Sequence, residues 1–235
     1  MEIGQGVDPK KWIPCEIILG SIIYAPMPLT TNFTATTNST STELYLPNLR
    51  EVYGYILLGY SSVRSFASMF PRLSIIHGQE LFNGFGLIIM ENFKLDEIGL
   101  TSLINIRRGN VIIARNPQLC YSTSIEWNEI LEDKDAKFIS RQNRDDCAIC
   151  PICSGCRCWS ATQCQSQCSP SCKGNCLSEK TCCPSQCTGG CYTQGSNIIC
   201  NACRKMRIYA TGRCVEQCPE DMLQVSTLIS VLTSC

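Results

Sequence analysis

The densest reactive cluster of the sequence is a run of four cysteines with two residues between neighbours: Cys147, Cys150, Cys153 and Cys156. Thiolates spaced in this way bind zinc or iron–sulfur clusters in reducing compartments and form disulfides in oxidising ones. The bacterial iron–sulfur run has three residues before its last cysteine and a proline after it, but here Arg157 follows. A zinc site usually separates two cysteine pairs by a loop, and this run is continuous. We therefore expect disulfides, no metal site and no cofactor.

Catalytic chemistry is not indicated elsewhere in the sequence. His77 is the single histidine, and a lone imidazole without a serine, cysteine or carboxylate phrase nearby is far more often structural than catalytic. The sequence contains neither a Gly-rich phosphate loop nor a kinase His-Arg-Asp phrase. We expect no catalytic residue and no enzyme activity in this segment.

The 20 cysteines divide the chain, because only Cys15 and Cys120 precede the cluster. The later part has few apolar residues, so disulfides must replace a hydrophobic core, each contributing about 2–4 kcal/mol. The spacing alone leaves their pairing open. We predict a first domain, a cysteine-rich domain and an unassigned tail, with the ranges 1–146, 147–218 and 219–235.

Charge and hydropathy exclude two classes of partner. Lys and Arg number 20 and Asp and Glu number 20, so the formal net charge is zero. A neutral chain lacks the basic surface that nucleic acid attracts. The apolar stretch 223–232 is about half the length that a membrane-spanning helix needs. We expect no nucleic-acid partner and no membrane span.

Two sequons indicate the compartment. Asn32 and Asn38 each begin an Asn-x-Ser/Thr acceptor site within 30–42, a Thr/Ser/Asn-rich stretch that is typical of an exposed loop. Together with the cysteines they predict an extracellular glycoprotein, either secreted or on the outer side of the plasma membrane. Residues 1–8 have neither the basic nor the apolar region of a signal peptide, so we expect a fragment.

A repeated phrase organises the first domain. Apolar residues, a glycine and further apolar residues recur at 17–23, 52–58, 75–81 and 106–112. Repeats of this size are typical of stacked coils, and β-branched runs favour strands with the glycine at a bend between them. An ordinary α/β sheet is the alternative, which the recurring phrase disfavours.

Three phrases of this domain resemble the receptor L domain of the insulin receptor and insulin-like growth factor receptor group: 69–78 (MFPRLSIIHG), 97–111 and 116–131. The later cysteines, above all the adjacent Cys182-Cys183, resemble the furin-like cysteine-rich region of the same receptors. The epidermal growth factor receptor group is the nearest competitor. The resemblance implies a mostly β fold: a right-handed parallel β-helix closed by disulfides, with Trp127 as an aromatic plug, followed by a disulfide-stapled rod.

The resemblance also implies a disulfide pairing. The pairs would be Cys120–Cys147, Cys150–Cys158, Cys168–Cys176, Cys172–Cys182, Cys183–Cys191, Cys187–Cys200 and Cys203–Cys214. Cys164 would pair with Cys153 or Cys156, which leaves one of those two unassigned. The usual partner of Cys15 would precede residue 1. The resemblance fades after Cys218, where two alternatives stay open: a bridge from Cys218 to Cys235, or an incorrect chain end at Cys235.

A ligand-binding face follows from the same resemblance. In insulin receptors the hormone lies on one face of the first L domain's strands, together with a helix from elsewhere in the receptor. Leu81, Phe82 and Met90 keep the character of that face. Four other matching positions, Gly4, Ala25, Pro26 and Gly59, replace larger or polar side chains. A divergent insulin-like peptide hormone is therefore a better candidate than a vertebrate-type insulin. The alternative for Phe82 is a turn residue packed on its own coil.

These expectations define the functional hypotheses. The first is the extracellular segment of an insulin-receptor-like receptor tyrosine kinase, with a peptide hormone, the rest of the receptor chain and a second receptor copy as partners. The second is a secreted, kinase-less protein that sequesters hormone. The third is an adhesion or structural L-domain module without a hormone.

Overall fold

The computed structural model describes residues 13–26, 44–147, 150, 152–172, 175–208 and 211–219, and the backbone of two later strands, β16 (Val225–Ser226) and β17 (Thr233–Ser234). The chain divides into two compact units. The first holds the described residues within Met1–Ser102 and Ile106–Gln165, and the second holds those within Leu103–Asn105 and Ser166–Cys235. The first unit thus includes the start of the cysteine-rich part, and the boundary expected after residue 146 stays a prediction.

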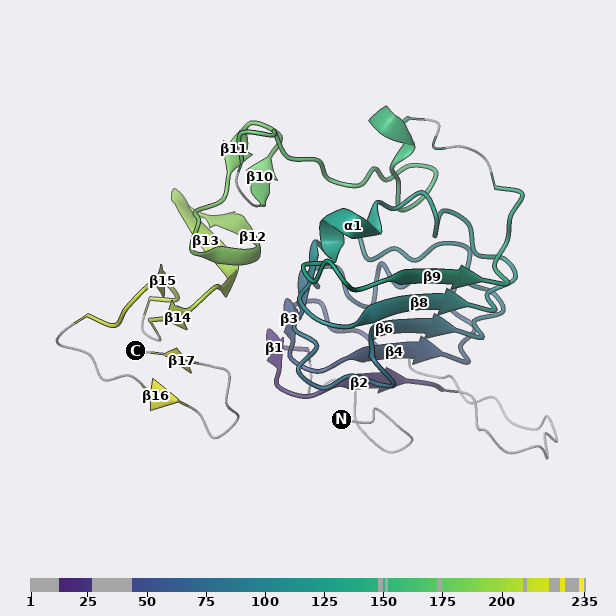
Figure 1. The fold of residues 1–235 in the computed structure, drawn as a ribbon, viewed down its shortest axis with the longest axis horizontal. Coiled ribbons are helices and arrows are strands. Elements are labelled where there is room, and N and C mark those ends of the chain that lie inside the picture. The colour runs from purple at the N-terminus through teal and green to yellow at the C-terminus, as the bar shows by residue number, and fades with distance from the viewer. Residues whose placement is uncertain are drawn as a thin grey trace. The chain divides into compact units, whose positions relative to one another are not determined.

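Parallel strands in two sheets build the first unit (Figure 1). The smaller sheet has the order β1 (Ile17–Ile18), β3 (Glu51–Val52), β5 (Ile75–Ile76) and β7 (Asn105–Ile106). The larger has the order β2 (Ile22–Tyr24), β4 (Ile56–Gly59), β6 (Phe85–Met90), β8 (Asn110–Ala114) and β9 (Phe138–Arg141). The chain visits the two sheets alternately, so successive coils stack with parallel strands. The expected mostly β fold built of parallel coils is confirmed.

The interior of the coils is filled by side chains that stand in register on neighbouring strands. At one level these are Ile22, Ile56, Leu87 and Val111, all fully buried. Two residues further along each strand, Tyr24, Leu58, Ile89 and Ile113 are likewise in register and buried. This repeat is the two-residue period of a β-strand, which sends alternate side chains into the core.

Glycines make the bends between the strand pairs, as the repeated phrase predicts. Gly78 has φ 63°, and a Cβ there would lie 2.2 Å from the carbonyl oxygen of Arg108 on the next coil. Gly109 has φ 91°, and a Cβ there would lie 2.5 Å from Leu81 Cδ2. Both positions need the left-handed backbone and the close approach that glycine allows.

The coils leave the larger sheet through a common two-residue corner. A residue with φ between 53° and 57° is followed by a serine or an asparagine, in the pairs Tyr60-Ser61, Glu91-Asn92, Arg115-Asn116 and Gln142-Asn143. Non-glycine residues adopt this left-handed conformation at a cost of order 1 kcal/mol or more, so the surroundings must hold it in place.

An asparagine ladder holds these corners together. Asn116 Nδ2 lies 3.2 Å from the carbonyl oxygen of Ile89, 3.0 Å from that of Ala114 and 3.0 Å from Asn143 Oδ1. Asn116 Oδ1 accepts from the backbone N–H of Asn92 at 3.0 Å and from Asn92 Nδ2 at 3.1 Å. Each asparagine thus bonds to the next coil as well as to its own, which fixes how the coils are stacked.

The last coil is closed by an aromatic cluster. Trp127 begins the short helix α1 (Trp127–Ile130) and is buried, with its indole N–H donating to the carbonyl oxygen of Ser122 at 2.9 Å. Its ring stacks on Phe138 at 5.1 Å between centroids and meets Trp159 edge-on at 6.0 Å. Trp127 therefore has the structural role expected of an aromatic plug.

Antiparallel hairpins and disulfides build the second unit. β10 (Cys176–Ser178) pairs with β11 (Thr181–Cys182), and β12 (Cys187–Gln194) pairs with β13 (Asn197–Cys203). A third hairpin joins β14 (Met206–Arg207) and β15 (Cys214–Val215). The disulfides that join two described cysteines of this unit are Cys168–Cys176, Cys172–Cys182, Cys183–Cys191, Cys187–Cys200 and Cys203–Cys214. Covalent loops thus take the place of a large apolar core.

Candidate ligand-binding face

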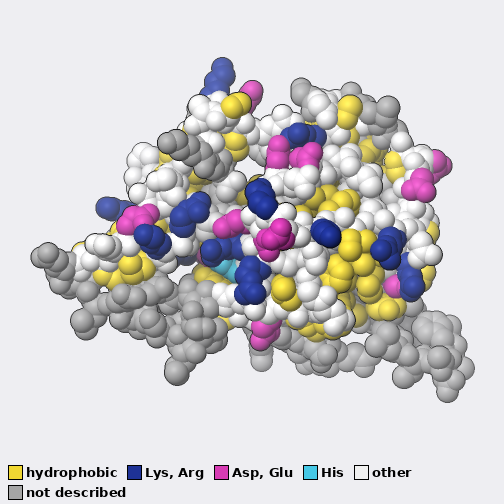
Figure 2. All heavy atoms as spheres, viewed as in Figure 1, with side chains coloured by type: hydrophobic (Ala, Val, Ile, Leu, Met, Phe, Trp, Pro, Cys, Tyr) yellow, Lys and Arg dark blue, Asp and Glu magenta, His cyan; other side chains and the backbone are white. Residues whose placement is uncertain are grey.

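An apolar row crosses the outer face of the larger sheet. The side chains in register are Ile23, Leu57, Ile88, Ile112 and Ile139, one from each of the five strands. They point outward because their strand neighbours fill the core. The row is partly exposed except at Ile88, which is 1% exposed. With strands about 4.8 Å apart, the row is about 19 Å long. Figure 2 shows apolar side chains gathered over these strands.

Leu81 and Phe82 lie beside this row, just before the start of β6. Phe82 and Phe85 exchange two backbone hydrogen bonds of 3.1 and 2.9 Å, which close a tight turn just before β6. The Phe82 side chain is 44% exposed, and its ring lies 5.7 Å from that of Tyr55. Leu81 packs against the backbone of Gly109 and is half-buried. Phe82 is thus both a turn residue and an exposed aromatic, so the two interpretations of this residue are compatible.

Met90 lies at the opposite end of β6. It stands in register with Gly59 of β4 and Ala114 of β8. A Cβ on Gly59 would come within 3.5 Å of Met90 Cγ, so the glycine leaves the Met90 side chain room to lie across β4. At about 3.3 Å per residue, β6 separates the two ends of the face by roughly 17 Å. The apolar row crosses β6 at Ile88, between Phe82 and Met90.

A polar edge follows Met90 at the corner of the coils. The Glu91 carboxylate accepts from Arg115 Nη1 at 2.8 Å, and Arg115 Nε donates to Gln142 Oε1 at 3.2 Å. This hydrogen bond and the negative charge of Glu91 raise the pKa of the exposed Arg115 guanidinium. The apolar face therefore ends at a fixed pair of opposite charges, which can orient a charged ligand more than it can add affinity.

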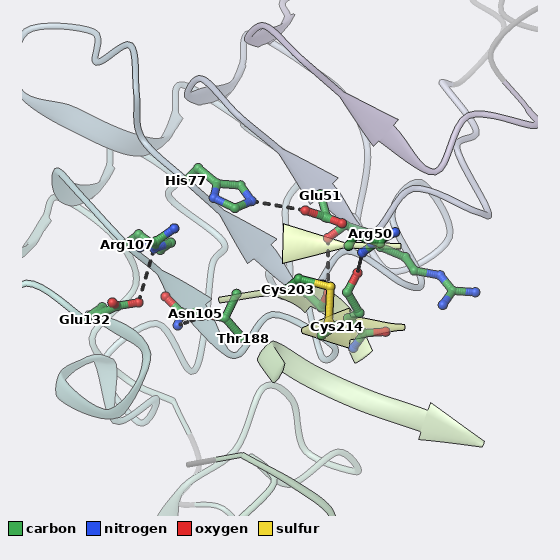
Figure 3. Close-up of polar contacts among 12 residues, drawn as sticks. Arg50, Glu51, His77, Asn105, Arg107, Glu132, Thr188, Cys203 and Cys214 are labelled. Carbon is green, nitrogen blue, oxygen red and sulfur yellow. Dashed lines mark hydrogen bonds and ion pairs between the residues drawn. A yellow bond between two sulfur atoms is a disulfide. The ribbon is translucent and has the colours of Figure 1, made fainter. Parts of the chain in front are cut away.

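His77 is tied to the smaller sheet. Its Nε2 lies 3.2 Å from Glu51 Oε2 on the neighbouring coil, and its ring stacks on Tyr53 at 4.0 Å between centroids. Figure 3 shows this pair, and Arg107 with Glu132, joining successive coils. These contacts are structural, since they link coils to one another.

Three disulfides staple the end of the first unit: Cys120–Cys147, Cys150–Cys158 and Cys153–Cys164. With the five of the second unit they include every pair that the family resemblance implies, and Cys164 takes Cys153 rather than Cys156. Cys15 and Cys156 carry free thiols, whereas Cys218 is disulfide-bonded. The sequons at Asn32 and Asn38, the position Gly4 and the end residue Cys235 lie outside the described residues.

Metal sites and membrane-spanning helices are two further features to consider in the described residues. Within the ranges that the structure describes, no group of three or more His, Cys, Asp or Glu side chains is arranged to hold a metal ion. Nor does any helix in that part of the chain have the length and apolar character to cross a bilayer.

Comparison with known families defines the class of this fold. Residues 14–131 match the receptor L domain family, and residues 133–235 match the furin-like cysteine rich region. The chain belongs to the receptor L domain family and carries a furin-like cysteine-rich region after the L domain. Neither of these is a catalytic module.

The similar curated proteins are receptors of the insulin type. The chain is 30% identical over 220 residues to the insulin-like receptor of Drosophila melanogaster, covering 80% of this chain and 10% of that protein. It is 34% identical over 201 residues to the insulin receptor of Xenopus laevis (77% and 15%). It is 36% identical over 192 residues to the insulin-like peptide receptor of Branchiostoma lanceolatum (77% and 14%). The chain spans 10% to 15% of the length of these relatives.

Sequence reasoning missed the isoleucine row, although a signal for it is present. A strand with one solvent-exposed face alternates apolar and polar residues. Here, by contrast, two strands have continuous apolar runs, Ile56-Leu57-Leu58 and Val111-Ile112-Ile113. Since the flanking residues fill the core, the middle residue of each run has to be apolar and outward. These apolar runs predict strands, and their continuity indicates in addition that the outer face of the sheet is apolar.

Proposed function

We propose that this chain is the extracellular ligand-binding segment of an insulin-receptor-like transmembrane receptor tyrosine kinase, and that the outer face of its larger sheet binds an insulin-family peptide hormone. The observation that carries the proposal is the apolar row across five strands, flanked by Phe82 just before the start of β6 and by Met90 at the end of β6. The names of the similar receptors support the class of ligand. The rest of the receptor chain and a second receptor copy are the further partners.

The shape of the face supports a peptide rather than a small molecule. The row is about 19 Å long and lies on a sheet surface, whereas small-molecule sites are enclosed cavities. Aromatic and large apolar anchors at the centre of a contact carry most of its binding energy. Here Phe82 is the exposed aromatic anchor, and Leu57 and Ile112 are half-exposed aliphatic neighbours.

The test is a binding titration of the oxidised chain. We would secrete residues 1–235 from an oxidising host and titrate the chain by surface plasmon resonance with insulin-family peptides, divergent insulin-like peptides among them. The titration would be run with and without a peptide for the receptor helix that completes the site. We expect micromolar or tighter binding, weakened about 10- to 100-fold by Phe82→Ala. Leu57→Arg, which places a charge in the middle of the row, should abolish it.

Matched controls separate the face from a general loss of folding. Phe93 is a phenylalanine of nearly the same exposure, 48% against 44% for Phe82, and it lies beyond the Asn92 corner. Phe93→Ala should change the affinity less than threefold, within the range of near-neutral contacts. Ile198→Arg, at an exposed position of β13, is the control for Leu57→Arg. Absence of binding by a folded, oxidised sample, or equal losses in Phe82→Ala and Phe93→Ala, would overturn the proposal.

A further inference from the structure

Cys156 is a free and exposed thiol within a cluster of disulfides. It ends the short 3-10 helix Ser154–Cys156, where Gly155 and Cys156 both have left-handed φ values, 68° and 55°. The tight reversal turns the chain back toward Cys150. A cavity of about 260 Å³ has Cys147, Cys150 and Cys156 among its lining residues, so Cys156 borders the same space as two disulfide-bonded cysteines.

The carbonyl oxygen of Cys156 lies 3.2 Å from Cys150 Sγ. This contact is not a hydrogen bond, because the sulfur of Cys150 is bonded to Cys158 and carries no proton. Standard backbone bond lengths then keep the Cα of Cys156 within about 6 Å of Cys150 Sγ. To form the bond, Cys156 must rotate its side chain and shift its backbone until its Cα and that of Cys150 lie within the range of about 4.4–6.8 Å that a disulfide requires.

We propose that Cys156 is an exchange thiol that attacks the Cys150–Cys158 disulfide and converts the end of the first unit between two covalent forms. The Cys156 thiolate forms a bond to Cys150 Sγ as the bond from Cys150 to Cys158 breaks. Cys158 leaves as a thiolate and takes up the proton that Cys156 gave up. One disulfide replaces another, so the step needs no external oxidant or reductant.

Contacts that do not depend on the bridge keep the leaving cysteine in place. Ser124 Oγ donates to the carbonyl oxygen of Cys158 at 2.8 Å. The backbone N–H of Trp159 donates to the carbonyl oxygen of Gln163 at 2.8 Å. Trp159 is buried against Trp127. The Cys153–Cys164 disulfide is untouched by the exchange. The exchanged form is therefore expected to keep its fold. The two forms differ in the free thiol, which is the exposed Cys156 before the exchange and the buried Cys158 after it.

The test locates the free thiol by mass spectrometry. Trypsin cuts after Arg144, Arg157 and Lys173, so Cys156 falls in fragment 145–157 and Cys158 in fragment 158–173. We would incubate the oxidised chain at pH 8, quench with acid to protonate thiolates, and alkylate with N-ethylmaleimide under denaturing conditions. The disulfides would then be reduced and their cysteines blocked with a second alkylating reagent, so that tryptic digestion separates the two fragments. We expect the label to move with time from Cys156 to Cys158, to a plateau between the two forms.

Two variants sharpen the result. Cys158→Ser removes the leaving thiol, so Cys150 and Cys156 should pair and neither should take up label. Cys156→Ser should never show label on Cys158 and serves as the control for folding, because its disulfides are those of the starting form. If Cys158→Ser fails to fold, the movement of the label in the unsubstituted chain still decides.

Several outcomes would overturn the proposal. The first is that the label stays on Cys156 throughout the incubation. Fragment sequencing places the transferred label on Cys164, which would mean attack on the Cys153–Cys164 bridge instead. The label disappears because Cys156 joins two chains in a disulfide dimer, or Cys158→Ser folds with both Cys150 and Cys156 alkylated.

Discussion

Removal of the central rung of the asparagine ladder should destabilise the first unit strongly. In Asn116→Ala the backbone N–H of Asn92 loses its acceptor, and the carbonyl oxygens of Ile89 and Ala114 lose a donor, all at buried positions. An orphaned buried N–H costs about 1–3 kcal/mol, and the void left by the amide adds to this. We expect the free energy of unfolding to fall by about 2–4 kcal/mol. The loss is limited because the Ala114 oxygen still accepts from the backbone N–H of Glu91.

Thermal unfolding followed by circular dichroism, with the disulfides intact, measures this loss. For a unit of this size, 1 kcal/mol corresponds to about 2–4 °C, so the midpoint should fall by roughly 5–15 °C. The control is Asn128→Ala, whose side chain is exposed and bonds only to Glu126 among the contacts described. That change should stay within about 0.5 kcal/mol. A midpoint for Asn116→Ala within 2 °C or so of the control would refute the role of the ladder.

Two further predictions concern the backbone and the charges. Gly109→Ala should lower the free energy of unfolding by about 2 kcal/mol or more, because its φ is 91° and the new Cβ would meet Leu81 Cδ2 at 2.5 Å. In denaturant titrations the control Gly195→Ala, with φ 61° and open space around the Cβ, should cost less. Hydrogen bonding and the charge of Arg144 lower the pKa of Asp146, so its NMR titration midpoint should lie below the usual Asp value of about 3.9. Any stability from this exposed pair is present above that value and lost as the pH falls through the depressed pKa. Arg144→Gln should return the midpoint toward the usual value, and an unchanged midpoint would contradict the pairing.

The coils could be predicted from the sequence because the physical signal is local. A glycine between two apolar runs predicts a bend between two strands, and Gly78 and Gly109 lie at such bends with positive φ. The cysteine composition likewise predicts a segment held by disulfides. Their pairing came from a family resemblance and not from spacing, and the choice between Cys153 and Cys156 as the partner of Cys164 depended on the three-dimensional structure.

The rest depends on contacts between residues far apart in the sequence. Asn92, Asn116 and Asn143 are separated by 24 and 27 residues, and nothing local in the sequence indicates that they bond to one another. The candidate face is a similar case. Leu81, Phe82 and Met90 were predicted one at a time from the resemblance, and their role as ligand contacts stays a prediction. Strand register places Ile88, the β6 member of the apolar row, between the two ends of β6.

The repeated corner has a consequence for how such a protein can change in evolution. The left-handed residues Tyr60, Glu91, Arg115 and Gln142 are separated by 31, 24 and 27 residues, although each is followed by the same kind of polar anchor. The coils are therefore aligned at the stacked corners, and the segment of chain between successive corners is free to differ in length. Insertions and deletions in these segments would leave the spacing of the apolar row unchanged. A lineage could thus remodel the periphery of the receptor while the arrangement of the sheet face is preserved.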